Sequence, residues 1–479
     1  MKVLLVEAGY KNKYPPLGLM KISAYHKQLN DEVVFVKSTS DKLGDQKWDR
    51  IYITTLFTFY WKTTVKTIKH FLKYVDNPSK VYVGGILATL LYDELKIEAG
   101  LEGINIYKGL LDKAGILGNN DIIIDNITPD YDIIDKNKNR YLKYEYKVQN
   151  AYITSTTKGC IRKCKFCAVK LLEPNYCGYK DIKEQIYDIN NKYGEKRHLM
   201  LMDNNILASH NLVNIVDDLV ALGFNKGNKN YKKKVGNRIL HQTRYIDFNQ
   251  GTDARLLNED VMIQLSRLEI RPLRIAFDHA DDENVNIYIQ AQRLAARYGV
   301  RNLSNYILFN FNDKPEDLYK RLRINIDLNL EFESNGLKTS IWSFPMKYMP
   351  ILGENSKGRK YIGVYWNAKL LRGVQCVLNA THAVVGPKKA FFEHAFGANC
   401  ESFMEIIYMP ELLIIQRKHC EENGSIAKWQ NLYRSLTEPE KLEFIELIKD
   451  NHFESKEIRN SKIKEMYNMY LIKVLNDFI

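Results

Sequence analysis

Between residues 2 and 344, short apolar runs alternate with stretches that repeat with helical periodicity. A chain with this pattern folds into parallel sheets whose faces are covered by helices, which is an α/β class. The first runs predict strands at 3–6, 32–36, 50–54, 81–83 and 104–107. Helices are expected between them at 17–29, 61–74 and 87–95. Ligands of such sheets bind beyond the carboxyl ends of the strands, so the residues that follow each strand are the candidates for function.

A second series of alternating elements follows a segment of turn-forming residues, 126–134, which reads as a linker. Its six predicted strands are 151–156, 198–202, 244–248, 273–277, 306–311 and 338–344. Periodicity alone allows either an open sheet or a barrel. Beyond residue 350 the pattern is mainly helical. The expected domains are therefore 1–130, a linker 131–150, a core 151–350 and a helical region 351–479.

Three cysteines, Cys160, Cys164 and Cys167, follow the first strand of the second series in a CxxxCxxC loop. Three thiolates can hold three irons of a [4Fe-4S] cluster and leave the fourth iron open. Structural zinc usually takes four protein ligands, and the nearest further cysteine, Cys177, has no paired neighbour. A disulfide is disfavoured, because seven cysteines in a long chain without a secretory signal suggest a reducing compartment. The other four are expected to be small buried residues: Cys177, Cys376, Cys400 and Cys420.

The cysteine loop, with Phe166 just before its last cysteine, resembles the signature of the radical SAM superfamily. That resemblance implies a partial (β/α)6 barrel of the TIM type over 151–350, which binds S-adenosyl-L-methionine at the open iron. It further implies reductive cleavage of that cofactor to a 5′-deoxyadenosyl radical, with the electron supplied by a flavodoxin- or ferredoxin-type donor. The radical would abstract hydrogen from a substrate that the sequence does not identify.

The first domain resembles the cobalamin-binding-like Rossmann domain that precedes many radical SAM cores. The resemblance rests on residues 15–18, Pro-Pro-Leu-Gly, and on Gly84 and Gly85 after the fourth strand, which are expected to let the backbone approach a cofactor. It implies cobalamin as a further cofactor and a methyltransferase outcome. The DxHxxG motif that supplies a histidine to cobalt is absent from the sequence. Either cobalamin binds without that histidine, or the domain serves as a lid or docking module.

Asp203, Asn204 and Asn205 follow the second core strand, where the family places a contact with the methionyl amine of the cofactor. Most members carry Gly-Gly-Glu there, so in this chain a carboxylate or an amide would have to make the contact. The alternative for Asp203 is to cap the next helix, because Asp leads the N-cap preferences.

Gln250, Asp253 and Arg255 follow the third core strand. They are candidates for the ribose hydroxyls or the carboxylate of the cofactor, for which the fork of an arginine is suited. The alternative is a structural pair of Arg255 with Asp253.

A formal net charge of +13 favours acidic partners, RNA among them. The basic stretch 224–238, rich in Lys, Gly and Asn, is typical of a solvated loop and also motivates the alternative of a radical SAM enzyme that modifies RNA. A further alternative is a non-enzymatic binding module in which the cysteine loop holds a structural metal ion. The chain has no apolar run of membrane-spanning length, and Glu7 interrupts its first one, so a cytoplasmic location is expected.

Overall fold

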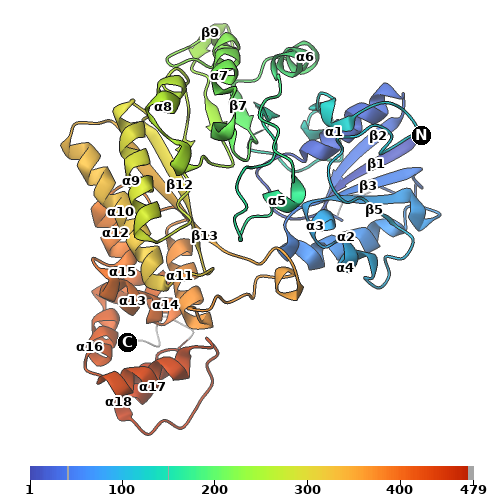
Figure 1. Cartoon of the computed structure of the whole chain (residues 1–479). Helices are drawn as coiled ribbons and strands as arrows, with labels where there is room; N and C mark the ends of the chain where they lie inside the picture. Colours follow the sequence, from blue (N-terminus) through green and yellow to red (C-terminus); the bar gives the residue numbers. More distant parts are fainter. Residues whose placement is uncertain (40–42, 149, 473–479) are drawn as a thin grey trace. The chain divides into compact units, whose positions relative to one another are not determined.

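The computed structural model describes residues 1–39, 43–148 and 150–472 and divides the chain into two compact units. Unit 1 comprises Met1–Pro272 with Met349–Tyr361, and unit 2 comprises Leu273–Tyr348 with the residues from Ile362 onward. Figure 1 labels their elements. The division falls inside the expected core 151–350, so the domain boundaries expected from the sequence stay predictions.

The first sheet of unit 1 is five-stranded and parallel, in the order β2-β1-β3-β4-β5. Its strands are β1 (Lys2–Glu7), β2 (Glu32–Lys37), β3 (Arg50–Thr55), β4 (Val81–Gly85) and β5 (Asn105–Ile106). The connecting helices are α1 (Leu17–Gln28), α2 (Trp61–Leu72), α3 (Ile86–Leu90) and α4 (Tyr92–Lys96). All five expected strands are present, and the expected helix 87–95 is split into α3 and α4 at Leu91 (φ −115°, ψ 41°).

Side chains alternate between the two faces of this sheet, as a strand period of two requires. Leu4, Val6, Ile51 and Ile53 join the buried core that α2, α3 and α4 cover, while α1 packs near β1, β2 and β3. The expected doubly wound sheet is therefore confirmed. Its strand order reverses between β1 and β3, which is where ligands bind in sheets of this topology.

The second sheet of unit 1 has the order β10-β7-β6 and is also parallel. Its strands are β6 (Ala151–Thr154), β7 (His198–Leu201) and β10 (Ile246–Phe248), and its helices are α5 (Val169–Leu172), α6 (Lys183–Tyr193), α7 (Leu212–Ala221) and α8 (Glu259–Leu265). These are the first three strands expected of the core.

The expectation of a solvated loop over 224–238 is wrong for its second half. Antiparallel strands β8 (Tyr231–Val235) and β9 (Arg238–Gln242) form a hairpin there, with almost every side chain exposed. Val235 pairs with Arg238 across a two-residue turn, in which Gly236 has a φ of +59°. A glycine with positive φ is what a tight hairpin turn of this length needs. The run of lysines concealed this pattern because lysine is depleted in strands.

Unit 2 contains the other three strands expected of the core, as a parallel sheet in the order β11-β12-β13. Its core elements are β11 (Leu273–Arg274), α9 (Asp282–Arg297), β12 (Asn302–Phe309), α10 (Pro315–Ser334) and β13 (Ser340–Lys347). The apolar pattern predicts a helix over 315–324, and the structure extends it to Ser334. All six strands expected of a barrel thus exist, three in each unit, and closure into a barrel stays a prediction.

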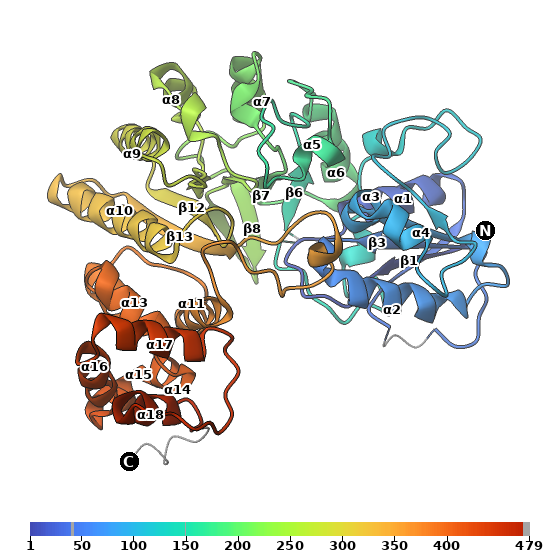
Figure 2. The same cartoon turned by 60° about the horizontal axis from the view of Figure 1, so that its bottom comes forward.

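The rest of unit 2 is helical, as expected, and Figure 2 shows its helices gathered into one bundle. They are α11 (Ala368–Ala380), α12 (Lys389–Phe396), α13 (Cys400–Tyr408), α14 (Glu411–Ile415), α15 (Arg417–Glu422), α16 (Ser425–Arg434), α17 (Glu438–Ile448) and α18 (Ser461–Asn468). None of the helices in the described part of the chain is long and apolar enough to cross a bilayer.

Candidate functional site

The cysteine loop leaves β6 and is closed at its base by the backbone. Lys158 and Cys177 exchange two hydrogen bonds, of 3.0 and 2.9 Å, as an antiparallel bridge. Gly159 stands beside this bridge with a φ of +72°, and a Cβ added there would lie 2.6 Å from the carbonyl oxygen of Asn175. The amide of Gly159 donates to a carboxylate oxygen of Glu173 at 2.6 Å. The base of the loop is therefore closed by contacts that do not involve its three candidate ligands.

Polar hydrogens are directed at two of the candidate thiols. The sulfur of Cys160 accepts from the backbone amide of Arg162 at 3.3 Å and from the side-chain amide of Asn205 at 3.4 Å. The guanidinium of Arg255 interacts with the thiol of Cys164. Hydrogen bonds to cysteine sulfur are among the features by which proteins tune iron–sulfur centres. The donor set around the loop thus fits thiolate ligands.

All seven cysteines are thiols, and Cys160, Cys164 and Cys167 are half-buried. No group of three or more His, Cys, Asp or Glu side chains is arranged to hold a metal ion among residues 1–39, 43–148 and 150–472. Cluster ligation by the three loop cysteines therefore stays a prediction.

The other four cysteines differ in exposure. Cys376 and Cys420 are buried as expected, and Cys400 is half-buried. Cys177 is exposed, so the expectation of burial is wrong for it. Its neighbourhood explains the difference, because its backbone pairs with Lys158 at the base of the loop while its thiol is directed at the carbonyl of Tyr179, 3.6 Å away.

Asp203, directly after β7, is engaged with the end of β6. Its buried carboxylate accepts hydrogen bonds of 2.5 to 3.1 Å from the backbone amides and hydroxyls of Thr156 and Thr157. Burial raises the pKa of this carboxyl although the four donors oppose the rise. Asp203 thus joins two strand ends, and it does not cap a helix. Its predicted contact with a cofactor amine stays a prediction.

Asn204 and Asn205 have different surroundings. The side-chain amide of Asn204 donates to Glu173 at 2.8 Å and so supports the base of the cysteine loop. Asn205 is 2% exposed, donates to the sulfur of Cys160, and keeps a buried carbonyl oxygen, Oδ1, for which the structure shows no hydrogen-bond partner. An unsatisfied buried acceptor is costly unless a ligand supplies a donor. Of Asp203, Asn204 and Asn205, only Asn205 has a buried side-chain oxygen without a hydrogen-bond partner.

Asp253 and Arg255, after β10, form the ion pair that was the alternative to cofactor binding. The Arg255 guanidinium donates to both Asp253 oxygens, at 2.6 and 3.0 Å. The same carboxylate accepts from Arg162 of the cysteine loop at 2.9 Å. Burial acts to raise the pKa of Asp253, but the two arginines hold it below its usual range. Gln250 lies exposed in the turn after β10. The roles predicted for these residues in cofactor binding stay predictions.

A cavity of about 440 Å³ opens at the carboxyl ends of the first sheet. Residues from α1, β3, β4 and the segment after β5 line it, Gly18, Gly84 and Gly85 among them, and most of its lining is apolar. Gly85 is required by packing, because its φ is +105° and a Cβ would lie 2.4 Å from the carbonyl oxygen of Thr55. The predicted glycines therefore do lie at a cavity, and contact with a cofactor there stays a prediction.

The residues that join the two strand-end regions were not among those predicted from the sequence. The hydroxyl of Tyr14, after β1, donates to the side-chain oxygen of Asn249, after β10, at 2.7 Å. Lys21 of α1 and Lys158 of the cysteine loop both contact Asp125. These residues are far apart in the sequence, so no local pattern could have paired them.

No protein-family model matches the chain, and no curated protein does. Among solved structures, the chain is similar to the radical S-adenosylmethionine methyltransferase TsrM from Kitasatospora setae with cobalamin and a [4Fe-4S] cluster bound, with 13% identity and a TM-score of 0.44 over 78% of each chain. It is also similar to the cobalamin-dependent S-adenosylmethionine radical enzyme OxsB with aqua-cobalamin and S-adenosylmethionine bound, with 11% identity and a TM-score of 0.46 over 98% of this chain and 78% of that one.

Proposed function

We propose that the chain is a radical SAM enzyme that reductively cleaves S-adenosylmethionine at a [4Fe-4S] cluster held by Cys160, Cys164 and Cys167. One observation supports this above the others: the ends of β7 and β10 present an amide and a guanidinium to the sulfurs of the loop that follows β6. A zinc staple needs a fourth protein ligand, whereas a cluster with an open iron does not. When bound, the cluster would supply the electron that splits the sulfonium of the cofactor into methionine and a 5′-deoxyadenosyl radical.

Asp203, Asn204 and Asn205 are the three candidates for the contact with the methionyl amine, and their surroundings favour one of them. Asn205 has an unpartnered buried oxygen beside Cys160, while the oxygens of Asp203 are already bonded. We assign the methionyl amine of the cofactor to Asn205 Oδ1. Asp203 and Asn204 then act as positioning residues for the loop.

The carboxylate of the cofactor is assigned to Arg255, which is about one-third exposed on its side chain and already lies beside Cys164. Arginine has five donors, so the pair with Asp253 leaves further N–H groups for a second carboxylate. Gln250, exposed in the same turn, is assigned to the ribose hydroxyls.

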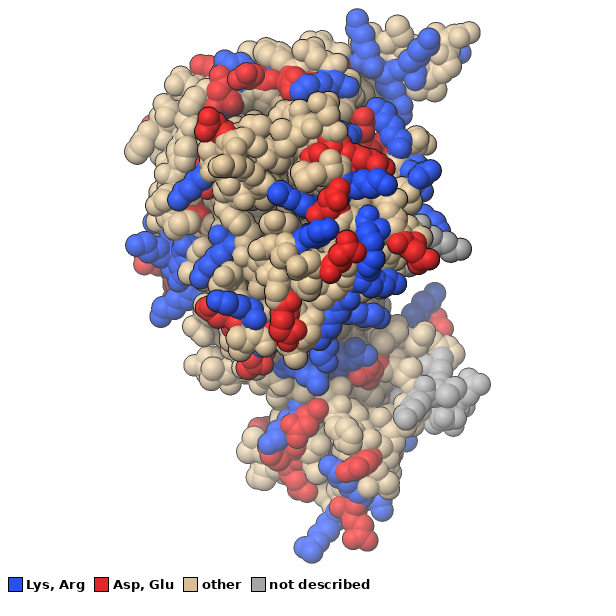
Figure 3. All heavy atoms as spheres, turned by 90° about the vertical axis from the view of Figure 1, so that its right-hand side faces the viewer, with Lys and Arg blue, Asp and Glu red and all other residues tan. Residues whose placement is uncertain are grey.

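A flavodoxin- or ferredoxin-type protein is proposed as the electron donor. The net charge of +13 on the chain favours the approach of an acidic donor. Figure 3 shows Lys and Arg side chains interspersed with Asp and Glu over one face, so the attraction is spread out.

Cobalamin is proposed as the second cofactor, with methyl transfer to a substrate carbon as the outcome. The cavity at the carboxyl ends of the first sheet fits a flat apolar group, because it is lined largely by apolar atoms and by the backbone of Gly84 and Gly85. A DxHxxG motif is absent from the sequence, so this chain offers no histidine to cobalt by that route. Without cobalamin, the same core would carry out a rearrangement, oxidation or coupling.

Modification of RNA is the second candidate, favoured by the exposed hairpin β8–β9. Lys232, Lys233 and Lys234 lie on one of its strands with all three side chains exposed. Lysines on a protruding ribbon contact phosphates, and retention of tRNA should then fall steeply as salt rises. Retention that is absent, or that salt does not change, would remove this candidate.

The decisive experiment is anaerobic reconstitution with iron and sulfide, followed by incubation with S-adenosylmethionine and a reductant. We expect a brown protein with four irons per chain that releases 5′-deoxyadenosine. A colourless protein that retains zinc and releases none would favour the metal-stapled binding module instead. Bound cobalamin is measured on the same sample by mass spectrometry.

A further inference from the structure

Positive charge is concentrated on the cysteine loop. Residues 158–172, from the start of the loop to the end of α5, contain five cations and no carboxylate. The cations are Lys158, Arg162, Lys163, Lys165 and Lys170. Three of the five lie between the first and the last of the candidate cluster ligands. A partner attracted by these charges is therefore brought to the loop itself.

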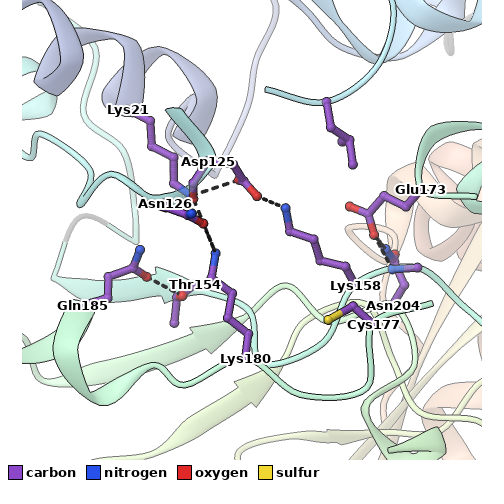
Figure 4. Close-up of polar contacts among 12 residues, drawn as sticks. Lys21, Asp125, Asn126, Thr154, Lys158, Glu173, Cys177, Lys180, Gln185 and Asn204 are labelled. Carbon is purple, nitrogen blue, oxygen red and sulfur yellow. Dashed lines mark hydrogen bonds and ion pairs between the residues drawn. The ribbon is translucent and has the colours of Figure 1, made fainter. Parts of the chain in front are cut away.

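Two of the five cations are paired within unit 1. Lys158, at the base of the loop, is directed at Asp125 (Figure 4). Arg162 pairs with Asp253 at 2.9 Å. Both cations are thereby turned toward the body of unit 1, and neither is counted in the surface described below.

The first carboxylate after the loop, Glu173, is also engaged at the base. It accepts hydrogen bonds from the side-chain amide of Asn204 (Figure 4) and from the backbone amide of Gly159, at 2.8 and 2.6 Å. Its charge acts on Lys158. The acids beside the loop are thus bound to its base and to Arg162.

The remaining three cations, Lys163, Lys165 and Lys170, are exposed. None of them forms an ion pair with a residue in the part of the chain that the structure describes. Two apolar side chains of the same stretch are exposed as well, Ile161 by 47% and Leu171 by 42%. We call these five residues the loop surface. Exposed apolar groups among charged ones are typical of surfaces that bind another protein.

Contacts behind the loop surface hold it in place. The backbone bridge between Lys158 and Cys177 closes the base of the loop. Helix α5, which carries two residues of the loop surface, packs near α3. Within the loop, the amide of Cys167 donates to the carbonyl oxygen of Cys164 at 3.2 Å. A surface that is ordered beforehand loses less conformational entropy when a partner binds.

The composition of the loop surface favours an acidic protein over RNA. Surfaces that bind single-stranded RNA combine cations with exposed aromatic rings, on which the bases stack. The exposed apolar side chains here are aliphatic, and Phe166, the aromatic residue of the loop, is half-buried. Proteins that exchange electrons meet through small interfaces, for which a few charged and apolar groups suffice.

We propose that the loop surface is the docking site of an acidic protein that carries one electron. This inference rests on the proposed function, because such a partner is needed only if the loop holds a redox centre. The reduced carrier gives up one electron and is oxidised, the centre held by the loop is reduced, and no bond forms or breaks at the docking site. Attraction between opposite charges speeds the encounter, and salt weakens it.

Calorimetric titration of the metal-free full chain with an acidic flavodoxin and an acidic ferredoxin tests the docking site. At least one carrier should bind, more weakly as salt rises. Changing Lys163, Lys165 and Lys170 together to Gln should raise its Kd about tenfold, because each exposed ion pair contributes modestly. The same change at the three lysines of β8 removes equal charge elsewhere in unit 1 and should alter Kd less than about twofold.

Three outcomes would overturn the proposal. If neither carrier binds, the loop surface does not dock one. If both triple variants weaken binding equally, net charge alone attracts the carrier. If tRNA retention depends on the loop lysines and carrier binding does not, the surface serves RNA.

Reconstituted protein separates this proposal from the proposed function. In the loop variant, 5′-deoxyadenosine formation driven by reduced flavodoxin or ferredoxin should fall about tenfold relative to formation driven by dithionite. An unchanged ratio would contradict docking at the loop surface. No product with dithionite would overturn the radical chemistry and leave the binding result standing, whereas product with dithionite and none with either carrier would overturn the docking site alone.

Discussion

Unit 1 has two parallel sheets, and the carboxyl ends of their strands differ in chemistry: one set of strand ends is polar and the other is largely apolar. At the ends of β6, β7 and β10, carboxylates, amides and guanidinium groups are bonded to one another and to the cysteine loop. At the ends of β3, β4 and β5, glycines and apolar side chains leave a cavity. One edge has the groups that hold and tune reactive atoms, and the other has room for the body of a ligand. The same topology therefore serves two tasks through the residues that follow each strand.

The largest expected effect is on the polar edge. Replacing any one of Cys160, Cys164 and Cys167 by Ala should abolish iron retention and release of 5′-deoxyadenosine, because a cluster with an open iron cannot lose another ligand. Cys177→Ala is the matched control, since Cys177 is exposed and contributes its backbone to the loop. Equal losses in Cys177→Ala would show that the loop acts through its shape.

Asn205→Ala should lower 5′-deoxyadenosine formation by about 10- to 100-fold, as the removal of groups that support metal ligands does. It removes both the hydrogen bond to Cys160 and the free acceptor. The rate, the KM for S-adenosylmethionine and the electron paramagnetic resonance of the reduced cluster are to be measured together. A reduced iron content with normal turnover per cluster would assign Asn205 to cluster retention alone.

Gly85→Ala tests the cavity edge and should lower the free energy of unfolding by about 2 kcal/mol, because the backbone is strained for an L residue and the new Cβ meets Thr55. Gly18→Ala lies at the same cavity with nothing within 4 Å of its Cβ. It should leave stability unchanged or raise it by about 0.5–1 kcal/mol, as expected for Gly within a helix. Chemical denaturation measures both, and equal effects would contradict the packing role of Gly85.

Lys21→Met tests the contact of Lys21 with Asp125, which links α1 to the cysteine loop, through the pH dependence of the free energy of unfolding. The pKa of Lys21 is about 7 in the folded chain and about 10.5 when unfolded, so the unfolded state binds more protons between these values. Stability should therefore rise by about 2 kcal/mol from pH 7 to pH 9, and Lys21→Met should remove that rise. Lys369, whose pKa burial lowers to about 8, donates to the carbonyls of Ile407 and Met409. Lys369→Met is the control, and its effect should begin about one pH unit higher.

The smallest effect is expected outside both edges. Changing Lys232, Lys233 and Lys234 to Gln should alter the free energy of unfolding by less than about 0.5 kcal/mol, because the strand is exposed. Turnover of S-adenosylmethionine without RNA should not change. A loss of tRNA retention in this variant would support the RNA alternative, and unchanged retention would oppose it.

The helices and strands could be predicted because the spacing of apolar residues along the chain shows which side chains are buried. The strands of both series, the helices of the first domain and the position of the cysteine loop followed from residues close together in the chain. Arg162 could not be predicted as the partner of Asp253, nor Tyr14 as the partner of Asn249, because these pairs depend on how strand ends meet. The lysines beside Asp125 were hidden for the same reason among 70 basic residues.

The polar candidates show a further limit of sequence reasoning. Asp203 and Asn205 stand two positions apart at one strand end, yet Asp203 is fully bonded and Asn205 has an oxygen without a partner. The type of residue indicates which bonds it can make, while only the surroundings show which bonds are already made.

The bridge between Lys158 and Cys177 has a consequence for the order of assembly. Because backbone hydrogen bonds and the contact of Gly159 with Glu173 close the loop, the chain can complete its fold before any iron arrives. We therefore expect the metal-free protein to accumulate as a stable, folded precursor in air. Maturation would then be a separate event, controlled by the supply of iron and sulfide.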